Sequence, residues 1–119
     1  MPHSTTIRFS YNWNNKLGCK AFTTLRLNNV KYEQEKVYDI YLDEKGKDPK
    51  YLGKARCVKT KVLMLEQVND FIAYLDTGYN AQECWNIVRR MYKKDNPEMV
   101  LILLLWVKRS QEQPKLPQV

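Results

Sequence analysis

Residues 99–107 form the longest apolar run in the chain, and they read Met-Val-Leu-Ile-Leu-Leu-Leu-Trp-Val. A helix that crosses a bilayer needs about 20 apolar residues, so this run is too short to span a membrane. A strand that is apolar on both faces is typical of the centre of a sheet, covered on both sides, or of the wall of a closed barrel. Leu103, in the middle of the run, is therefore expected to be buried.

The segments before this run alternate between strand and helix patterns. Gly78 is placed to end a first helix in the left-handed conformation, and Asn80 with Glu83 forms the capping-box pattern that opens a second helix. This order favours an α+β fold, with a small curved sheet or β-barrel and two helices inserted before the last strand. The pattern predicts strands at 5–10, 21–27, 36–42 and 51–64, the last with a bulge near 59–61, and the first helix at 65–75.

A chain of 119 residues provides one domain. We expect this domain to cover residues 5–109, with flexible tails at 1–4 and 110–119. Lys and Arg number 20 against 13 acids, which gives a formal charge of +7. Such an excess attracts polyanions at long range. A basic surface without a function is the alternative, and it leaves open a protein-interaction module.

The cysteines and the histidine exclude several kinds of site. Cys19, Cys57 and Cys84 are far apart in the sequence, and His3 is the only histidine. No metal site is expected from this set, and Ser-His or Cys-His catalysis lacks its base. No disulfide framework is expected either, which favours a reducing compartment, and the first ten residues lack the apolar core of a signal peptide. We therefore expect a cytoplasmic protein with no cofactor and no membrane partner.

A dense group of cations begins in the turn before the fourth strand and continues along it. Such a turn and strand form a plausible track for the phosphates of RNA. Aromatic residues between and around them, such as Tyr11, Trp13 and Tyr51, have rings on which unpaired bases could stack. The alternative is that the lysines keep an edge strand soluble. The proposed nucleic-acid-binding residues are Lys45, Lys47, Lys50, Lys54, Arg56, Lys59 and Lys61.

A second candidate site begins at Lys20, in the loop before the second strand. Thr24 and Arg26 follow on one face of that strand, while Leu25 and Leu27 face the core. An ammonium, a hydroxyl and a guanidinium that converge suit a carbonyl, a phosphate or a base edge. The alternative is a structural arginine paired with an acid on the sheet.

In this segment the chain resembles the ASCH domains of the PUA-like superfamily. The family signature Gly-x-Lys-x-x-Thr-x-Arg has counterparts in Gly18, Lys20, Thr24 and Arg26, with Lys20 one residue further from the threonine than in the family. Further counterparts are the segments 51–56, 76–79 and 101–107. The resemblance covers most of residues 5–109, mainly in the order of elements.

The resemblance implies a PUA-like barrel with a cleft that binds RNA or a modified nucleoside. A bacterial branch of the family hydrolyses acetylated cytidine without a metal. By analogy with that branch, Thr24 would be the nucleophile, Lys20 its activator, Arg26 the electrostatic support, and Asp76 or Glu66 the acid. Thr77 stands where the family often has Glu, so RNA binding is the leading expectation and a small amidohydrolase the alternative.

Overall fold

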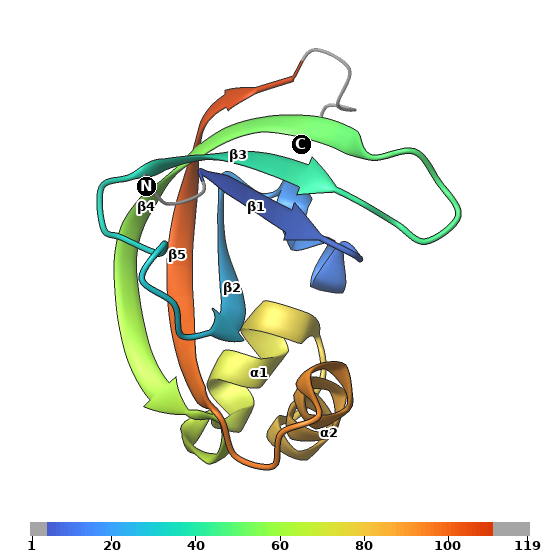
Figure 1. The fold of residues 1–119 in the computed structure, drawn as a ribbon, viewed down its shortest axis with the longest axis vertical. Coiled ribbons are helices and arrows are strands. Elements are labelled where there is room, and N and C mark those ends of the chain that lie inside the picture. The colour runs from blue at the N-terminus through green and yellow to red at the C-terminus, as the bar shows by residue number, and fades with distance from the viewer. Residues whose placement is uncertain (1–4, 111–119) are drawn as a thin grey trace.

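A computed structural model describes residues 5–110 of the chain (Figure 1). Within these residues, five strands form one curled sheet, and two α-helices and two 3₁₀ helices complete the fold. The expected α+β fold, with a curved sheet and two helices before the last strand, is confirmed. The elements are β1 (Thr6–Phe9), η1 (Trp13–Gly18), β2 (Ala21–Leu27), β3 (Val37–Leu42), β4 (Lys50–Met64), η2 (Leu65–Gln67), α1 (Asp70–Thr77), α2 (Ala81–Tyr92) and β5 (Glu98–Arg109).

The strand order in the sheet is β1-β3-β4-β5-β2, with β1 and β3 parallel and the other neighbours antiparallel. The strands β1 and β2 are the two edges, and no pairing joins them in the described chain. The sheet curls so strongly that these edges approach each other (Figure 1). The rings of Phe9 on β1 and Phe22 on β2 are 6.0 Å apart across this gap. The barrel is thus open along one seam.

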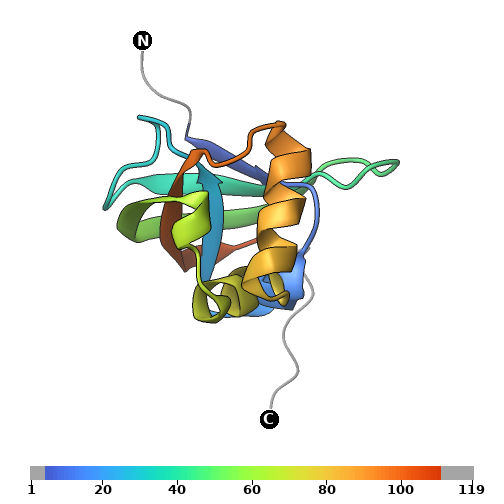
Figure 2. The same ribbon diagram turned by 90° about the horizontal axis from the view of Figure 1, so that it is seen from below.

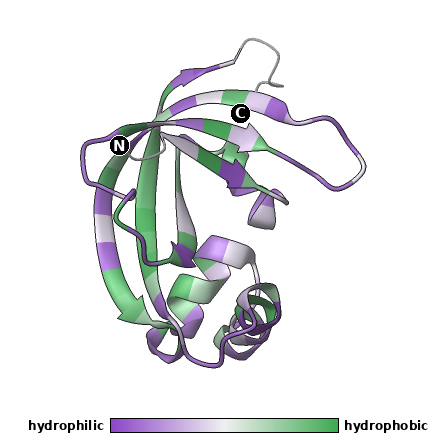
Figure 3. Cartoon of the chain, in the orientation of Figure 1, coloured by the Kyte–Doolittle hydropathy of each residue, from purple (hydrophilic) through white to green (hydrophobic). Residues whose placement is uncertain are grey.

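The strand β5 is central, as its apolar run predicts, and it serves a different core on each face. Ile102 and Leu104 are fully buried inside the curled sheet, with Tyr38 and Ile40 of β3. Met99, near the start of β5, is buried on the other face, in a second core. The two α-helices lie at the end of the sheet where β5 begins (Figures 2 and 3). The expectation for Leu103 is wrong: this side chain is 36% exposed. The helices cover only the first part of that face, and Leu103 lies beyond them, between Thr23 and Lys59 on the neighbouring strands.

The first helix begins later than its apolar spacing predicts. Residues 65–67 form only a 3₁₀ turn, and the α-helix starts at Asp70 because Asn69 caps it, its side-chain oxygen accepting a hydrogen bond from the Ile72 N–H at 2.9 Å. The end of the helix and the start of the next one are as expected. Gly78 has φ of 82°, in the left-handed region. Asn80 and Glu83 form the expected capping box of α2.

Two irregularities interrupt β4, at Lys54/Ala55 and at Cys57/Lys59. The second adjoins the region where the sequence predicts a bulge. After it, Lys59, Lys61 and Leu63 lie on the same face of β4. Lys59 and Lys61 are exposed, and Leu63, which the helices cover, is buried.

The last strand ends at Arg109, and the Ser110 N–H donates to the Leu52 carbonyl at 2.9 Å. The predicted tail segments 1–4 and 111–119 lie outside the described residues. In the described part of the chain, no helix is long and apolar enough to cross a membrane.

Candidate functional site

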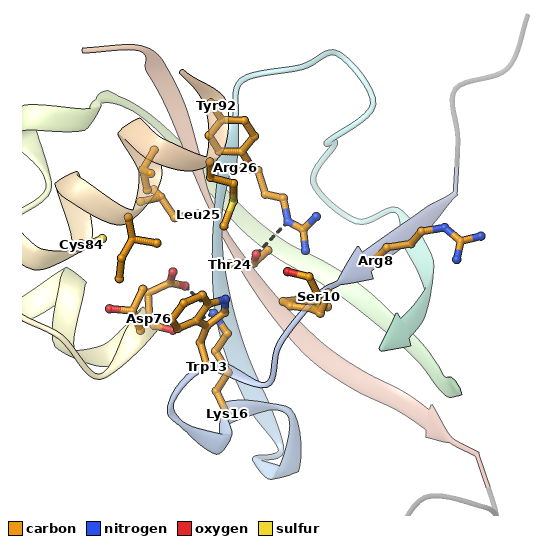
Figure 4. Close-up of a pocket in the computed structure, with 15 residues that line it drawn as sticks. Arg8, Ser10, Trp13, Lys16, Thr24, Leu25, Arg26, Asp76, Cys84 and Tyr92 are labelled. Atoms are coloured by element: carbon orange, nitrogen blue, oxygen red, sulfur yellow. Dashed lines mark hydrogen bonds and ion pairs between the residues drawn. The ribbon is translucent and has the colours of Figure 1, made fainter. Parts of the chain in front are cut away.

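A pocket lies at the open seam of the sheet, between the edge strands β1 and β2 and under the two α-helices (Figure 4). Its volume is about 90 Å³. The edge strands supply backbone and charged side chains, η1 supplies Trp13 and Lys16, and the helices supply the apolar wall. Its lining residues are Arg8, Phe9, Ser10, Trp13, Lys16, Thr24, Leu25, Arg26, Asp76, Thr77, Cys84, Ile87, Val88, Met91 and Tyr92.

Arg26 projects from β2 into this pocket and is held without a charged partner. Its Nε donates to the Thr24 hydroxyl at 3.0 Å, and its guanidinium lies 4.6 Å from the centre of the Phe9 ring. Among residues 5–110, no carboxylate forms an ion pair with it. A half-buried guanidinium that is oriented but not neutralised is suited to an anion or to a carbonyl oxygen of a ligand.

Lys16 and Asp76 form a buried ion pair at the other end of the pocket (Figure 4). The two side chains are each 6% exposed, and the ammonium donates to the Asp76 carboxylate at 3.0 Å and to its backbone carbonyl at 2.8 Å. The Thr23 hydroxyl donates to the same carboxylate oxygen at 2.9 Å. Burial lowers the pKa of Lys16, although Asp76 opposes this shift. A lysine with a lowered pKa, paired with an acid in a pocket, is typical of functional sites.

Cys84 also lines the pocket, but its thiol has low reactivity. Burial and the nearby Asp76 carboxylate raise the pKa of the thiol to about 11. The nucleophilic form of cysteine is the thiolate, so a thiol with this pKa is inert near neutral pH. The candidates for chemistry in the pocket are therefore its other polar side chains, among them Lys16, Thr24, Arg26 and Asp76.

The structure brings together three of the residues that the sequence singles out and leaves two outside. Thr24, Arg26 and Asp76 all line the pocket. Lys20 is exposed and does not line it. Glu66 lies on η2, where it pairs with Arg89 at 2.9 Å.

Lys16 takes the place in the pocket that was expected of Lys20. The spacing of Trp13, Lys16 and Leu17 in the sequence could have predicted that Lys16 points inward. In a helical turn these positions share one face, so a lysine between two apolar residues faces inward. The asparagines around it obscure the pattern, because they are typical of a loop.

The basic run on the turn and β4 does not line the pocket. Four of its seven members carry no ion pair among the described residues, namely Lys45, Lys50, Lys59 and Lys61. The other three are paired with acids that sequence reasoning alone does not connect with them: Lys47 with Glu44 at 3.8 Å, Lys54 with Asp39 at 2.8 Å and Arg56 with Glu35 at 2.9 Å.

Comparison with family models, curated proteins and solved structures finds no match to this chain. The evidence for function is therefore the chemistry of the pocket. In the described residues, no group of three or more His, Cys, Asp or Glu side chains is placed to hold a metal ion.

Proposed function

We propose that this chain is an ASCH-type, PUA-like domain that binds RNA or a modified nucleoside in the pocket at the β1–β2 seam. The observation that carries the proposal is Arg26, which is oriented by Thr24 and Phe9 and has no acidic partner among residues 5–110. Keeping a guanidinium half-buried and unpaired costs stability unless a ligand uses it. Phosphates and the carbonyl edges of bases are such ligands.

The charges around Arg26 support an anionic ligand. Arg8 lines the same pocket, and its ion pair with Asp43 is long, at 3.8 Å, and exposed. Burial and the nearby Arg26 and Lys36 cations lower the pKa of Lys31. Cations that disfavour one another's charge create a positive potential that a phosphate would relieve.

The size of the pocket limits what enters it. Pockets that enclose a drug-sized molecule have volumes of about 300 Å³ or more, and this one has about 90 Å³. It suits one planar group, such as a base or its modified edge, with the sugar and phosphate outside. A ligand held in this way places its phosphates outside the pocket, where the exposed part of Arg8 could reach them.

Direct binding measurements test this proposal. The probes are short single-stranded RNAs and the corresponding nucleoside monophosphates, titrated at two salt concentrations. We expect Arg26→Gln to weaken binding at least tenfold, because charged hydrogen bonds of this kind contribute about 1.5–3 kcal/mol. Arg90→Gln is the matched control, since Arg90 is an exposed arginine of α2 that does not line the pocket. Equal affinities of the two variants would contradict the proposal.

A second candidate, a metal-independent amidohydrolase acting on acetylated cytidine, is favoured by the Lys16–Asp76 pair. In this scheme the Thr24 hydroxyl attacks the acetyl carbonyl, and the scheme requires Lys16 to lose its own proton first, because it forms an ion pair with Asp76, and then to accept the hydroxyl proton. The proton passes to the departing amine of cytidine, and water then hydrolyses the acetyl-threonine ester to acetate. Arg26 supports the negative charge that develops on the carbonyl oxygen. The buried Lys16 supplies the activator that Lys20, exposed and outside the pocket, cannot.

Incubation with acetylated cytidine, followed by chromatography, distinguishes the hydrolase from the binding domain. The hydrolase requires that Thr24→Ala and Lys16→Met abolish turnover, while Lys20→Met retains it. We expect little turnover in the parent protein, because Asp76 already binds Lys16 and Thr23 and is not free to act on a substrate. Rapid turnover that is lost in Thr24→Ala and Lys16→Met would make the hydrolase the leading function.

A further inference from the structure

A second hollow adjoins the pocket, and three aromatic rings stand around it. The Trp13 ring lies 4.8 Å from Tyr11 and 6.1 Å from Tyr79, centre to centre, with both pairs edge to face. Tyr11 is 53% exposed and Tyr79 is 42% exposed. We call these three residues the aromatic platform. The hollow is open, has a volume of about 310 Å³, and is otherwise lined by Asn12, Asn14, Asn15, Thr77 and Gly78.

The hollow and the pocket are neighbours that share two lining residues. Trp13 and Thr77 line both of them. A ligand that fills the pocket with one group and continues past Trp13 therefore reaches the aromatic platform next. Tyr11 and Tyr79, in contrast, line only the hollow, so their effect on binding is separable from that of the pocket.

The chemistry of the hollow suits a nucleobase. Its lining has no charged side chain, so neither a carboxylate repels phosphates nor a cation binds them there. Exposed aromatic rings stack on bases without regard to sequence. The Asn12 oxygen already accepts from the Leu17 N–H, and the Asn14 amide already donates to the Tyr74 carbonyl. The Asn15 amide has both donors and an acceptor, which match the polar edges of a base.

The loop that carries Trp13 is attached to helix α1 by a side-chain hydrogen bond. Asn14 and Asn15 have φ of 57° and 53°, in the left-handed region that costs free energy for residues other than glycine. The Asn14 amide donates to the Tyr74 carbonyl of α1 at 3.1 Å and secures the loop against the helix. A fixed ring loses less entropy when a base stacks on it, which favours binding.

We propose that the aromatic platform stacks the base adjacent to the one in the pocket, so that the ligand is single-stranded RNA of at least two nucleotides. This inference rests on the proposed RNA or nucleoside binding at Arg26. Of these two ligands, it favours RNA over the free nucleoside. The net charge of the chain, +7, fits a polyanion that extends beyond the pocket.

The test compares probes of one and of several nucleotides. Single-stranded RNA hexamers of A, C, G or U and the four nucleoside monophosphates are titrated against the parent and the double variant Tyr11→Ala/Tyr79→Ala. We expect the variant to bind the best hexamer at least about tenfold more weakly, with an unchanged salt slope because no charge is removed. Its affinity for the monophosphate should be unchanged. Tyr74→Ala, another exposed tyrosine that lines neither hollow nor pocket, should leave both affinities unchanged.

The outcomes separate this inference from the proposal on which it rests. Tyr11→Phe/Tyr79→Phe keeps the rings and should retain hexamer binding, which assigns the loss to the rings and not to the hydroxyls. The unchanged monophosphate affinity of the alanine variant rules out damage to the fold as the cause. Monophosphate binding that needs Arg26, with hexamer affinity equal in the parent and the alanine variant, would overturn the platform alone. Absence of binding to every nucleotide probe by the parent would overturn both.

Discussion

Lys16 and Asp76 show how one pair of residues sets the character of the pocket. Two charges that are each 6% exposed have lost most of their hydration, and the attraction between them must offset this loss. The additional hydrogen bonds to the Asp76 carbonyl and from Thr23 compensate further. The pair joins η1, β2 and α1. It also gives the pocket polar groups at a place where an apolar contact would give none.

A double-mutant cycle measures this coupling. We expect Lys16→Met and Asp76→Asn each to lower the free energy of unfolding by about 3–5 kcal/mol, because each leaves the other charge buried without a partner. The combined variant removes both charges, so it should lose far less than the sum of the single changes. Chemical denaturation followed by circular dichroism gives the three values. Additive losses would show that the two groups do not depend on each other.

At the scale of elements, β5 explains why an apolar run does not mean equal burial of its residues. Val100, Ile102 and Leu104 face the interior of the curled sheet and are buried. The odd-numbered residues of β5 are buried only where helices cover them, so Met99 is buried and Leu103 is not. Burial alternates along the middle of the strand, but the sequence does not show this because the exposed residues, such as Leu103, are also apolar.

Aspartate substitutions at two adjacent positions of β5 test this arrangement. Leu104→Asp should cost at least about 3 kcal/mol, because it buries a carboxylate among apolar side chains. Leu103→Asp should cost about 1 kcal/mol or less, since the new carboxylate reaches solvent and has Lys59 as its neighbour on β4. Thermal and chemical unfolding of both variants provide the comparison. A loss at Leu103 as large as that at Leu104 would mean that this face is covered.

The crossing of β4 and β5 depends on a glycine. Gly53 has φ of 131°, and a Cβ atom there would lie 2.2 Å from the Lys108 carbonyl oxygen and 2.8 Å from the Arg109 Cα. Because both atoms belong to the backbone of the neighbouring strand, no side-chain movement relieves the clash. Gly46, in the turn between β3 and β4, has φ of 82°, but a Cβ atom added there would have no other atom within 4 Å.

We therefore expect Gly53→Ala to destabilise the fold much more than Gly46→Ala. Gly46→Ala introduces only the strain of a positive φ, about 1 kcal/mol. Gly53→Ala introduces this strain and also forces β5 to move away from β4. Unfolding midpoints of the two variants, measured side by side, give the difference. Similar midpoints would indicate that β5 moves aside at little cost.

At the scale of the whole molecule, the curl of the sheet decides where function can reside. The two edge strands come from the first part of the chain, and the curl brings them toward each other (Figure 1). The pocket lies where residues of β1, β2 and the helices meet. The basic run belongs to the other part of the sheet, on β4 and the turn before it. In the proposed function, its unpaired members supply charge for RNA that extends beyond the pocket.

The salt dependence of RNA binding tests this role of the basic run. We expect Lys59→Gln/Lys61→Gln to reduce the slope of log affinity against log salt, by about 0.7 for each phosphate that the variant no longer neutralises. Lys54→Gln/Arg56→Gln removes the same charge from residues that Asp39 and Glu35 already neutralise, so its slope should change less. Equal slopes for the parent and both variants would mean that the basic run does not contact RNA and serves only to keep the protein soluble.

The sequence by itself determined the strands, the second helix with its capping box, the left-handed Gly78 and the alternation that puts Thr24 and Arg26 on one face. These features depend on neighbours within a few residues, whose chemistry is visible along the chain. Only the tertiary structure decided that Lys16, not Lys20, joins Asp76, that Leu103 is exposed and that Lys54 and Arg56 have acidic partners. Each of these depends on residues far apart in sequence, 60 positions for Lys16 and Asp76, and the curl of the sheet sets their distance. Local periodicity carries no information about which distant surfaces cover one another.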